Sequence, residues 1–210
     1  MRRVCVIFDL DGTLVDSEYL CNQALLDLLP DLGESIDALV SRNRGRKLAE
    51  IFGDLQERLD RKLPQDFEST YRARVSELFL RDLRPTPGAD EMLNSLQHPC
   101  CVASSGPLTK IRQALQVTGL ERYFGNRIYS SYQVRSWKPD PELFLHAARE
   151  MCYLPSECVV VEDSEVGLQA AAKAGMMALH YAPNAVPSSP YTLRNLGDLS
   201  RMLGDLDGDA

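Results

Sequence analysis

Two carboxylates stand two positions apart near the start of the 210-residue chain, directly after an apolar segment. Asp9 and Asp11 follow residues 4–8, and five consecutive apolar residues are typical of a parallel strand that is buried on both faces. The pair is therefore expected at the carboxyl end of a strand, where carboxylates could act on a ligand. Because Asp and Gly are also common turn residues, an ordinary acidic turn is the alternative for this stretch taken alone.

Candidate partners for the two carboxylates follow later apolar segments or lie in the loops after them. They are Ser104, Ser105, Lys138, Glu162 and Asp163. Ligands of open parallel sheets bind outside the carboxyl ends of the strands, so we expect all these side chains in one crevice. Several carboxylates in one place need a counter-charge, and an all-oxygen set of ligands indicates Mg²⁺. Lys138 and the Ser104 hydroxyl add the positive charge and the donor that a transferring phosphoryl group requires.

The elements that must position these residues alternate between strands and helices. The apolar segments predict strands at 4–8, 100–103, 127–130, 158–161 and 177–181. Helical spacing predicts helices at 89–96, 108–118, 165–174 and 195–203, with a further helix that Asp140 caps and Pro141 begins. This alternation predicts an α/β fold with a doubly wound, Rossmann-like parallel sheet.

One long segment interrupts the alternation after the first strand. Apolar residues repeat there at helical spacing, which predicts helices at about 17–29, 36–40, 48–63 and 65–80. Pro85, Pro87 and Gly88 then mark a junction. We therefore expect a core domain of residues 1–16 and 84–210, and an inserted, all-helical cap domain of residues 17–83.

The composition disfavours several classes of protein. Fractions of 44% hydrophobic and 25% charged residues are ordinary for a soluble domain, and the net charge of -7 argues against nucleic acid or an anionic membrane as partner. No apolar run approaches the ~18 residues of a membrane span, and the first residues are not expected to act as a signal peptide. The six cysteines contain no CxxC pair and are expected to be reduced. We expect a cytoplasmic monomer or weak homodimer whose partner is a small phosphorylated molecule.

The ordered motifs resemble those of the haloacid dehalogenase-like phosphohydrolases. The chain has DLDGT at 9–13, a strand-ending Ser104, the lysine of WKPDP at 138, and the acidic pair of VVVEDS at 162–163. Four motifs in order are more specific than any one of them, and together they span nearly the whole chain. The helical segment that starts directly after the first motif resembles the subclass with a helical C1 cap.

The resemblance implies a role for each motif residue. Asp9 would be the nucleophile that forms an aspartyl-phosphate, and Asp11 the general acid that later activates water. A crowded and partly desolvated setting is expected to keep the Asp11 carboxyl neutral, so that it can donate a proton. Ser104 and Lys138 would bind the phosphoryl group.

The resemblance also implies two sets of binding groups. Mg²⁺ would be bound by Asp9, the carbonyl of Asp11, Asp163, and Glu162 either directly or through water. The backbone N–H groups of Leu10, Asp11 and Ser105 would donate to the phosphoryl oxygens.

The residues at the motif positions also distinguish between the reactions that members of this family catalyse. Asp11 disfavours the dehalogenases and the phosphonate-cleaving enzymes, which lack an acid there. Mutases of the β-phosphoglucomutase type carry a histidine in the first cap helix, where this chain has Leu20 and Cys21. Hydrolysis is therefore favoured, and a sugar-phosphate mutase stays as an alternative. An alternative of another class is a phosphoaccepting signalling module of the receiver type, although receivers lack a helical insertion after their first strand.

A basic loop in the cap could select the substrate. Arg44, Gly45, Arg46 and Lys47 lie in the sequence RNRGRK at 42–47. A run of charges is often only a solvated surface. In capped relatives, however, a similar loop faces the catalytic aspartate, which implies that these residues bind an anionic leaving group. The arrangement is similar to that of 6-phosphogluconate phosphatase-type enzymes, which implies a phosphorylated sugar or sugar acid as substrate.

Overall fold

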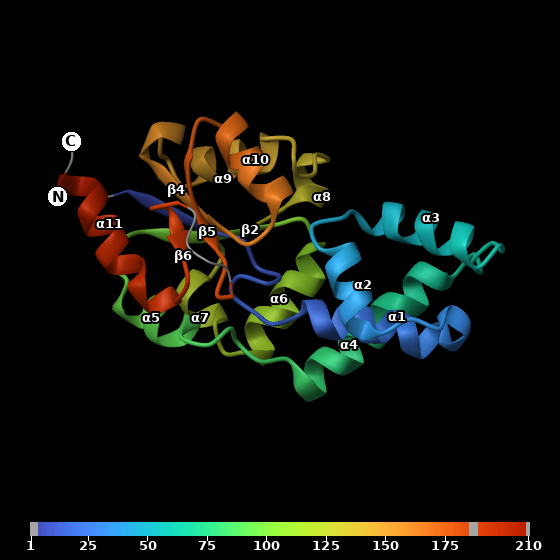
Figure 1. Cartoon of the computed structure of the whole chain (residues 1–210). Helices are drawn as coiled ribbons and strands as arrows, with labels where there is room; N and C mark the ends of the chain where they lie inside the picture. Colours follow the sequence, from blue (N-terminus) through green and yellow to red (C-terminus); the bar gives the residue numbers. More distant parts are fainter. Residues whose placement is uncertain (1–3, 185–188, 209–210) are drawn as a thin grey trace.

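The structure, a computed structural model, describes residues 4–184 and 189–208 of the chain (Figure 1). Within these residues six strands form one parallel sheet in the order β3-β2-β1-β4-β5-β6. The strands are β1 (Cys5–Phe8), β2 (Cys100–Ser104), β3 (Ile128–Ser130), β4 (Cys158–Glu162), β5 (Met177–Tyr181) and β6 (Thr192–Leu193). The first strand thus lies between β2 and β4, and the expected α/β fold is confirmed.

Helices cover both faces of the sheet, which explains why its strands read as continuous apolar runs. In β1, Val6 and Phe8 belong to one buried apolar cluster, whereas Cys5 and Ile7 belong to a second cluster on the opposite face. The first cluster contains residues of α5 (Ala89–Ser95), α6 (Leu108–Val117), α7 (Glu121–Phe124) and α11 (Leu199–Gly208). The second contains residues of α9 (Glu142–Glu150) and α10 (Glu165–Lys173).

Four further helices lie to one side of the sheet, beyond the carboxyl end of β1 (Figure 1). They are α1 (Glu18–Leu28), α2 (Ile36–Asn43), α3 (Leu48–Arg58) and α4 (Phe67–Asp82). Edge-to-face ring contacts join α3 to α4. The ring centroid of Phe52 lies 5.2 Å from that of Phe67 and 5.6 Å from that of Tyr71. All four helices fall within residues 17–83, and the boundaries of the core and cap domains stay a prediction.

Short elements are where the structure departs from the expectations. The two-residue strand β6 and the four-residue helices α7 and α8 (Ser131–Val134) were not predicted, because so few residues show no periodicity. The last helix begins at Leu199 and ends at Gly208 instead of spanning 195–203, and α9 begins at Glu142, after Pro141. No described helix is long and apolar enough to cross a membrane.

Candidate active site

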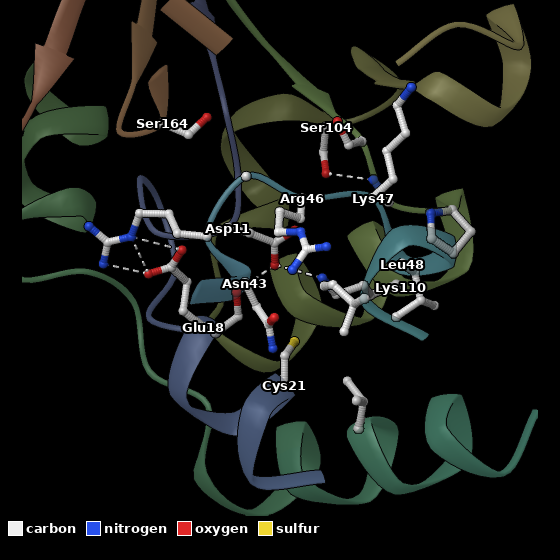
Figure 2. Close-up of a pocket in the computed structure, with 18 of the residues that line it drawn as sticks. Asp11, Glu18, Cys21, Asn43, Arg46, Lys47, Leu48, Ser104, Lys110 and Ser164 are labelled. Atoms are coloured by element: carbon white, nitrogen blue, oxygen red, sulfur yellow. Dashed lines mark hydrogen bonds and ion pairs between the residues drawn. The ribbon is translucent and has the colours of Figure 1, made fainter. Parts of the chain in front are cut away.

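The carboxyl ends of the three central strands meet at one cavity of about 380 Å³, which the cap helices also line (Figure 2). Its wall contains six of the residues that the motifs single out as catalytic or metal-binding. These are Asp9, Asp11, Ser104, Lys138, Glu162 and Asp163. The register of the sheet explains the meeting, since β1 pairs with both β2 and β4 and all three strands run in the same direction. Asp9 and Asp11 therefore lie beside the other motif residues, as the functional interpretation predicts, and not in an isolated acidic turn.

A buried lysine joins two of the carboxylates. The Nζ atom of Lys138 lies 2.5 Å from Oδ1 of Asp9 and 2.6 Å from Oε2 of Glu162. Burial and the charge of Glu162 raise the pKa of Asp9, and the Lys138 ammonium opposes that rise. Burial alone would lower the pKa of Lys138, but the two carboxylates outweigh it and raise that pKa. Lys138 is therefore fixed as a cation against the carboxylate that the motifs predict as nucleophile.

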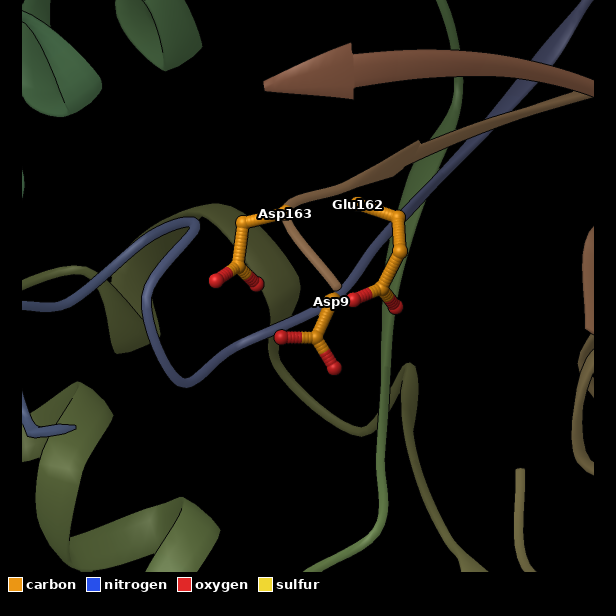
Figure 3. A group of neighbouring side chains, drawn as sticks. All are labelled: Asp9, Glu162 and Asp163. Atoms are coloured by element: carbon orange, nitrogen blue, oxygen red, sulfur yellow. The ribbon is translucent and has the colours of Figure 1, made fainter. Parts of the chain in front are cut away.

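Three carboxylates are close enough together to share a cation (Figure 3). Asp9, Glu162 and Asp163 each offer one oxygen, and these oxygens lie within 4.8 Å of one another. Burial and the charge of Glu162 raise the pKa of Asp163 to about 7. The three carboxylates therefore repel one another when ionised, and a divalent cation would relieve that repulsion. Hard oxygen ligands with this spacing fit a small divalent cation.

The three carboxylates are not equally available to a cation. Glu162 Oε2 accepts from Lys138, and its Oε1 accepts from the hydroxyl of Ser164 at 2.7 Å and from the backbone N–H of that residue at 3.0 Å. From the residues that the structure describes, Asp163 accepts a single long hydrogen bond, 3.3 Å from the Thr13 hydroxyl to its Oδ1. Asp163 is thus the better placed direct ligand, and Glu162 is better placed to act through water.

Two glycines make room for these acids. The backbone of Gly12 has a φ of 84°, and a Cβ added there would lie 2.5 Å from Oδ2 of Asp163. A Cβ on Gly167 would lie 2.0 Å from the carboxyl carbon of Glu162. Any side chain at either position would therefore displace an acid of the candidate metal site.

Asp11 is held by two partners that the sequence did not indicate. Its Oδ1 accepts from the Ser17 hydroxyl at 2.5 Å and from Lys110 Nζ at 2.8 Å. Burial alone would raise the pKa of Asp11, but the charge of Lys110 and the two hydrogen bonds outweigh it and lower that pKa. The expectation of a neutral Asp11 carboxyl is therefore wrong for this arrangement. Ser17 directly precedes α1, and its hydroxyl donates to Asp11 instead of capping the helix.

Two other predicted phosphoryl-binding residues lie at the end of β2. The hydroxyl of Ser104 accepts from the backbone N–H of Gly106 at 3.1 Å, and both Ser104 and Ser105 line the cavity. The side chain of Leu10, in contrast, is fully buried in the apolar core. Leu10 can therefore contribute to the cavity only through its backbone.

The basic cap loop lies against the core, and all four of its predicted residues line the cavity. Gly45 has a φ of 71°, and a Cβ there would lie 2.9 Å from Cγ2 of Val166, in the first turn of α10. Arg44 Nη2 forms an ion pair with Oε2 of Glu18 at 2.6 Å, and Arg44 Nε lies 3.9 Å from Oδ2 of Asp163. The approach of the Gly45 backbone to α10 therefore places this loop over the acidic cluster.

The other two basic residues of the loop differ in their partners. Arg46 Nη1 lies 3.8 Å from Asp54, and Arg46 Nη2 donates to the carbonyl of Glu50 at 3.4 Å. The side chain of Lys47 forms no hydrogen bond or ion pair with any residue among 4–184 and 189–208. Lys47 is therefore the cation of this loop with its charge still free for a ligand.

A second set of contacts joins the helical segment to the sheet domain at the cavity. Arg72 of α4 donates to the Tyr132 hydroxyl at 2.8 Å, and the ring of Trp137 packs edge-on against Tyr132 with centroids 5.4 Å apart. Nearby, Gln113 of α6 donates to the Ser76 hydroxyl at 2.6 Å. Trp137 thus packs beside Lys138 and also lines the cavity.

A parallel sheet with buried carboxylates and a lysine at its carboxyl edge, covered by helices that follow the first strand, defines a class of α/β hydrolases. The model of the haloacid dehalogenase-like hydrolase family matches residues 4–175. The chain belongs to this family, as the four motifs predict, and it is an enzyme of the hydrolase class.

Two relatives are similar over most of their length. The chain is 35% identical to a 6-phosphogluconate phosphatase from Escherichia coli (strain K12), over 86% of this chain and 84% of the relative. It is 31% identical to a fructose-1-phosphate phosphatase from the same organism, over 85% of this chain and 96% of the relative.

Two solved structures share the fold. A conserved haloacid dehalogenase-like protein of unknown function from Agrobacterium tumefaciens (strain C58) is 25% identical with a TM-score of 0.82, over 98% of this chain and 99% of that one. A putative β-phosphoglucomutase from Thermotoga maritima is 26% identical with a TM-score of 0.75, over 97% of this chain and 99% of that one. The two relatives thus carry the names of phosphatases, and one of the two structures carries the name of a mutase.

Proposed function

We propose that the protein is a Mg²⁺-dependent phosphomonoesterase that hydrolyses a small sugar phosphate or sugar-acid phosphate through an aspartyl-phosphate intermediate. The observation that carries this proposal is the buried Lys138 between Asp9 and Glu162, with Asp163 beside them, at the floor of a cavity with a basic wall. The named phosphatases among the relatives support it.

The positions of the side chains support a two-step reaction. An oxygen of Asp9 attacks phosphorus, an Asp9–phosphorus bond forms, and the bond to the leaving oxygen breaks as that oxygen takes a proton from Asp11. Water then attacks the aspartyl-phosphate, gives its proton to Asp11 and releases phosphate. A bound phosphate dianion beside Asp11 favours the protonated carboxyl, because like charges raise a carboxyl pKa.

The metal would be held by residues that already face one another. Asp9, Asp163 and the carbonyl of Asp11 would bind Mg²⁺, and Glu162 would assist through water because Lys138 and Ser164 occupy its oxygens. The ion supplies positive charge to the phosphoryl oxygens. Lys138 and Ser104 orient the same group from the other side.

The raised pKa of Asp163 makes the stability of the metal-free protein depend on pH. Its ordinary pKa of 3.8 rises to about 7 in the folded state, so the folded protein binds a proton more tightly than the unfolded chain. The free energy of unfolding should then fall by a few kcal/mol, roughly 2–4, as pH rises from about 4 to about 7. Denaturant unfolding in EDTA measures this fall.

Mg²⁺ should restore the lost stability at pH 7 and leave the stability at pH 4 nearly unchanged, because the ion binds the ionised carboxylates. Asp163→Asn should reduce the pH dependence, with the raised pKa of Asp9 accounting for the rest, and should weaken the response to Mg²⁺. Identical pH profiles with EDTA and with Mg²⁺ would contradict the proposed metal site.

We expect Lys47 to bind the leaving group of the substrate. It is the basic residue of the cap loop whose side chain has no partner among the described residues, and a carboxylate or second phosphate on the substrate would pair with it. A phosphate-release screen over sugar phosphates, sugar-acid phosphates and nucleotides tests the substrate class. Lys47→Met should lower kcat/KM about 10–100-fold on a sugar-acid phosphate and change it little on p-nitrophenyl phosphate.

Lys62 offers a matched control, because it is an exposed cap lysine outside the cavity. Lys62→Met should behave as the wild type on both substrates. An equal loss of kcat/KM on both esters in Lys47→Met would mean that Lys47 supports the fold or the phosphoryl site. That result would contradict its role in binding the leaving group.

A sugar-phosphate mutase is the second candidate, because one structural neighbour is a putative β-phosphoglucomutase. The cavity argues against it, since no histidine is among the described residues that line it and Cys21 occupies the first cap helix there. Phosphorus NMR separates the two activities, because hydrolysis of β-glucose 1-phosphate releases phosphate whereas a mutase forms glucose 6-phosphate. The cytoplasmic location and the monomeric or weakly dimeric state stay predictions.

A further inference from the structure

Lys110 lies in the first turn of α6, where the helix dipole disfavours a cation that has no acidic partner. Its partner is Asp11, with Nζ 2.8 Å from Oδ1, and the Nζ atom also lies 5.7 Å from the centre of the Phe79 ring of α4. The side chain is 22% exposed, so the ion pair is largely shielded from water. Lys110 is therefore held between the core and the cap and points at the proposed acid and base.

Both side-chain donors to Asp11 reach the same oxygen. Ser17 Oγ at 2.5 Å and Lys110 Nζ at 2.8 Å both donate to Oδ1. Oδ2 accepts no hydrogen bond from the described residues. Since Asp11 lines the cavity, the oxygen without a donor is the one that is open to a ligand or to water.

We propose that Lys110 is a positioning residue, which holds Asp11 by Oδ1 together with Ser17 and so reserves Oδ2 for proton exchange with the substrate. This inference rests on the proposed function. When the bond between phosphorus and the leaving oxygen breaks, the proton moves from Oδ2 of Asp11 to that oxygen. When water attacks the aspartyl-phosphate, its proton returns to Oδ2 and the bond between Asp9 and phosphorus breaks.

The leaving group separates this role from a structural one. A p-nitrophenolate leaves without protonation, whereas the more basic phenolate needs a proton in the transition state. The kcat/KM of each ester reports only the steps up to aspartyl-phosphate formation, because release of the phenol is irreversible while no product has accumulated. The effect of a variant on the two values therefore isolates proton donation by Asp11.

Steady-state kinetics of the full-length protein with Mg²⁺ and these two esters test the proposal. Lys110→Met should lower kcat/KM for phenyl phosphate about 10²-fold and that for p-nitrophenyl phosphate less than about 5-fold. Lys110→Arg, which keeps the charge, should lose less on phenyl phosphate than Lys110→Met. Arg112→Met, on the same helix but 41% exposed, is the control and should match the wild type.

Ser17→Ala removes the second donor and keeps the test open if Lys110→Met does not fold. It should also lower kcat/KM more for phenyl phosphate than for p-nitrophenyl phosphate, but by a smaller factor than Lys110→Met. Equal losses on both esters, or no loss on either, would overturn the role of Lys110. A wild-type enzyme that cleaves neither ester would instead overturn the proposed function, so the two failures are distinguishable.

Discussion

Asp9→Asn is expected to lower phosphate release from p-nitrophenyl phosphate by about 10⁴-fold or more in the presence of Mg²⁺. An amide has nearly the same shape as the carboxylate but cannot attack phosphorus. It also removes one charge from the trio of Asp9, Glu162 and Asp163, whose oxygens lie within 4.8 Å of one another. The variant should therefore fold and bind phosphorylated ligands, while its turnover is lost.

Asp16→Asn is the matched control, because Asp16 is an exposed carboxylate in the same segment. It should keep the wild-type rate. A crystal structure of the beryllofluoride adduct, which mimics a phosphoryl group, should place beryllium on Asp9. An adduct on a carboxylate of a later strand would indicate receiver-type chemistry, and full activity in Asp9→Asn would refute the proposed intermediate.

The sheet and the meeting of the four motifs could be expected from the sequence for one physical reason. Strands buried on both faces must be apolar throughout, so 4–8, 100–103 and 158–161 are recognisable without any partner in view. The ends of parallel strands then coincide at one edge of the sheet. Asp9 and Glu162 follow from this rule, because each stands at the end of its strand.

Side-chain pairing across the cavity could not be expected in the same way. The pair of Lys110 and Asp11 joins positions 99 residues apart, and its formation depends on how α6 is rotated above the sheet. The one signal was the unfavourable position of a lysine in the first turn of a helix. Arg44 likewise reads as a free cation in the sequence, whereas it is paired with Glu18 of the first cap helix.

Lys138→Met is expected to lower activity about 10³-fold and the free energy of unfolding at pH 8 by about 3–5 kcal/mol, since removing one partner leaves buried charges uncompensated. Methionine keeps most of the length of the side chain and its packing near Phe144, whose ring centroid lies 4.9 Å from Nζ. The loss of stability therefore comes from Asp9 and Glu162, which face each other without their shared cation.

The pH dependence of that loss has a definite sign. Without the ammonium the pKa of Asp9, already raised by burial and by Glu162, rises further, so the folded variant binds protons more tightly than the unfolded chain. Stability must then decrease as pH increases, and the variant should lie closer to the wild type at pH 5 than at pH 8. Denaturant unfolding at the two pH values measures the difference.

A second substitution separates stability from catalysis. The double variant Lys138→Met/Glu162→Gln removes one of the two like charges that faced the ammonium. It should recover much of the stability, because a neutral amide beside Asp9 removes the repulsion between Asp9 and Glu162. It should recover no activity, since the cation that orients the phosphoryl group is still missing. If the single variant is as stable as the wild type, or if the double variant regains turnover, Lys138 does not have the paired role that its contacts with Asp9 and Glu162 indicate.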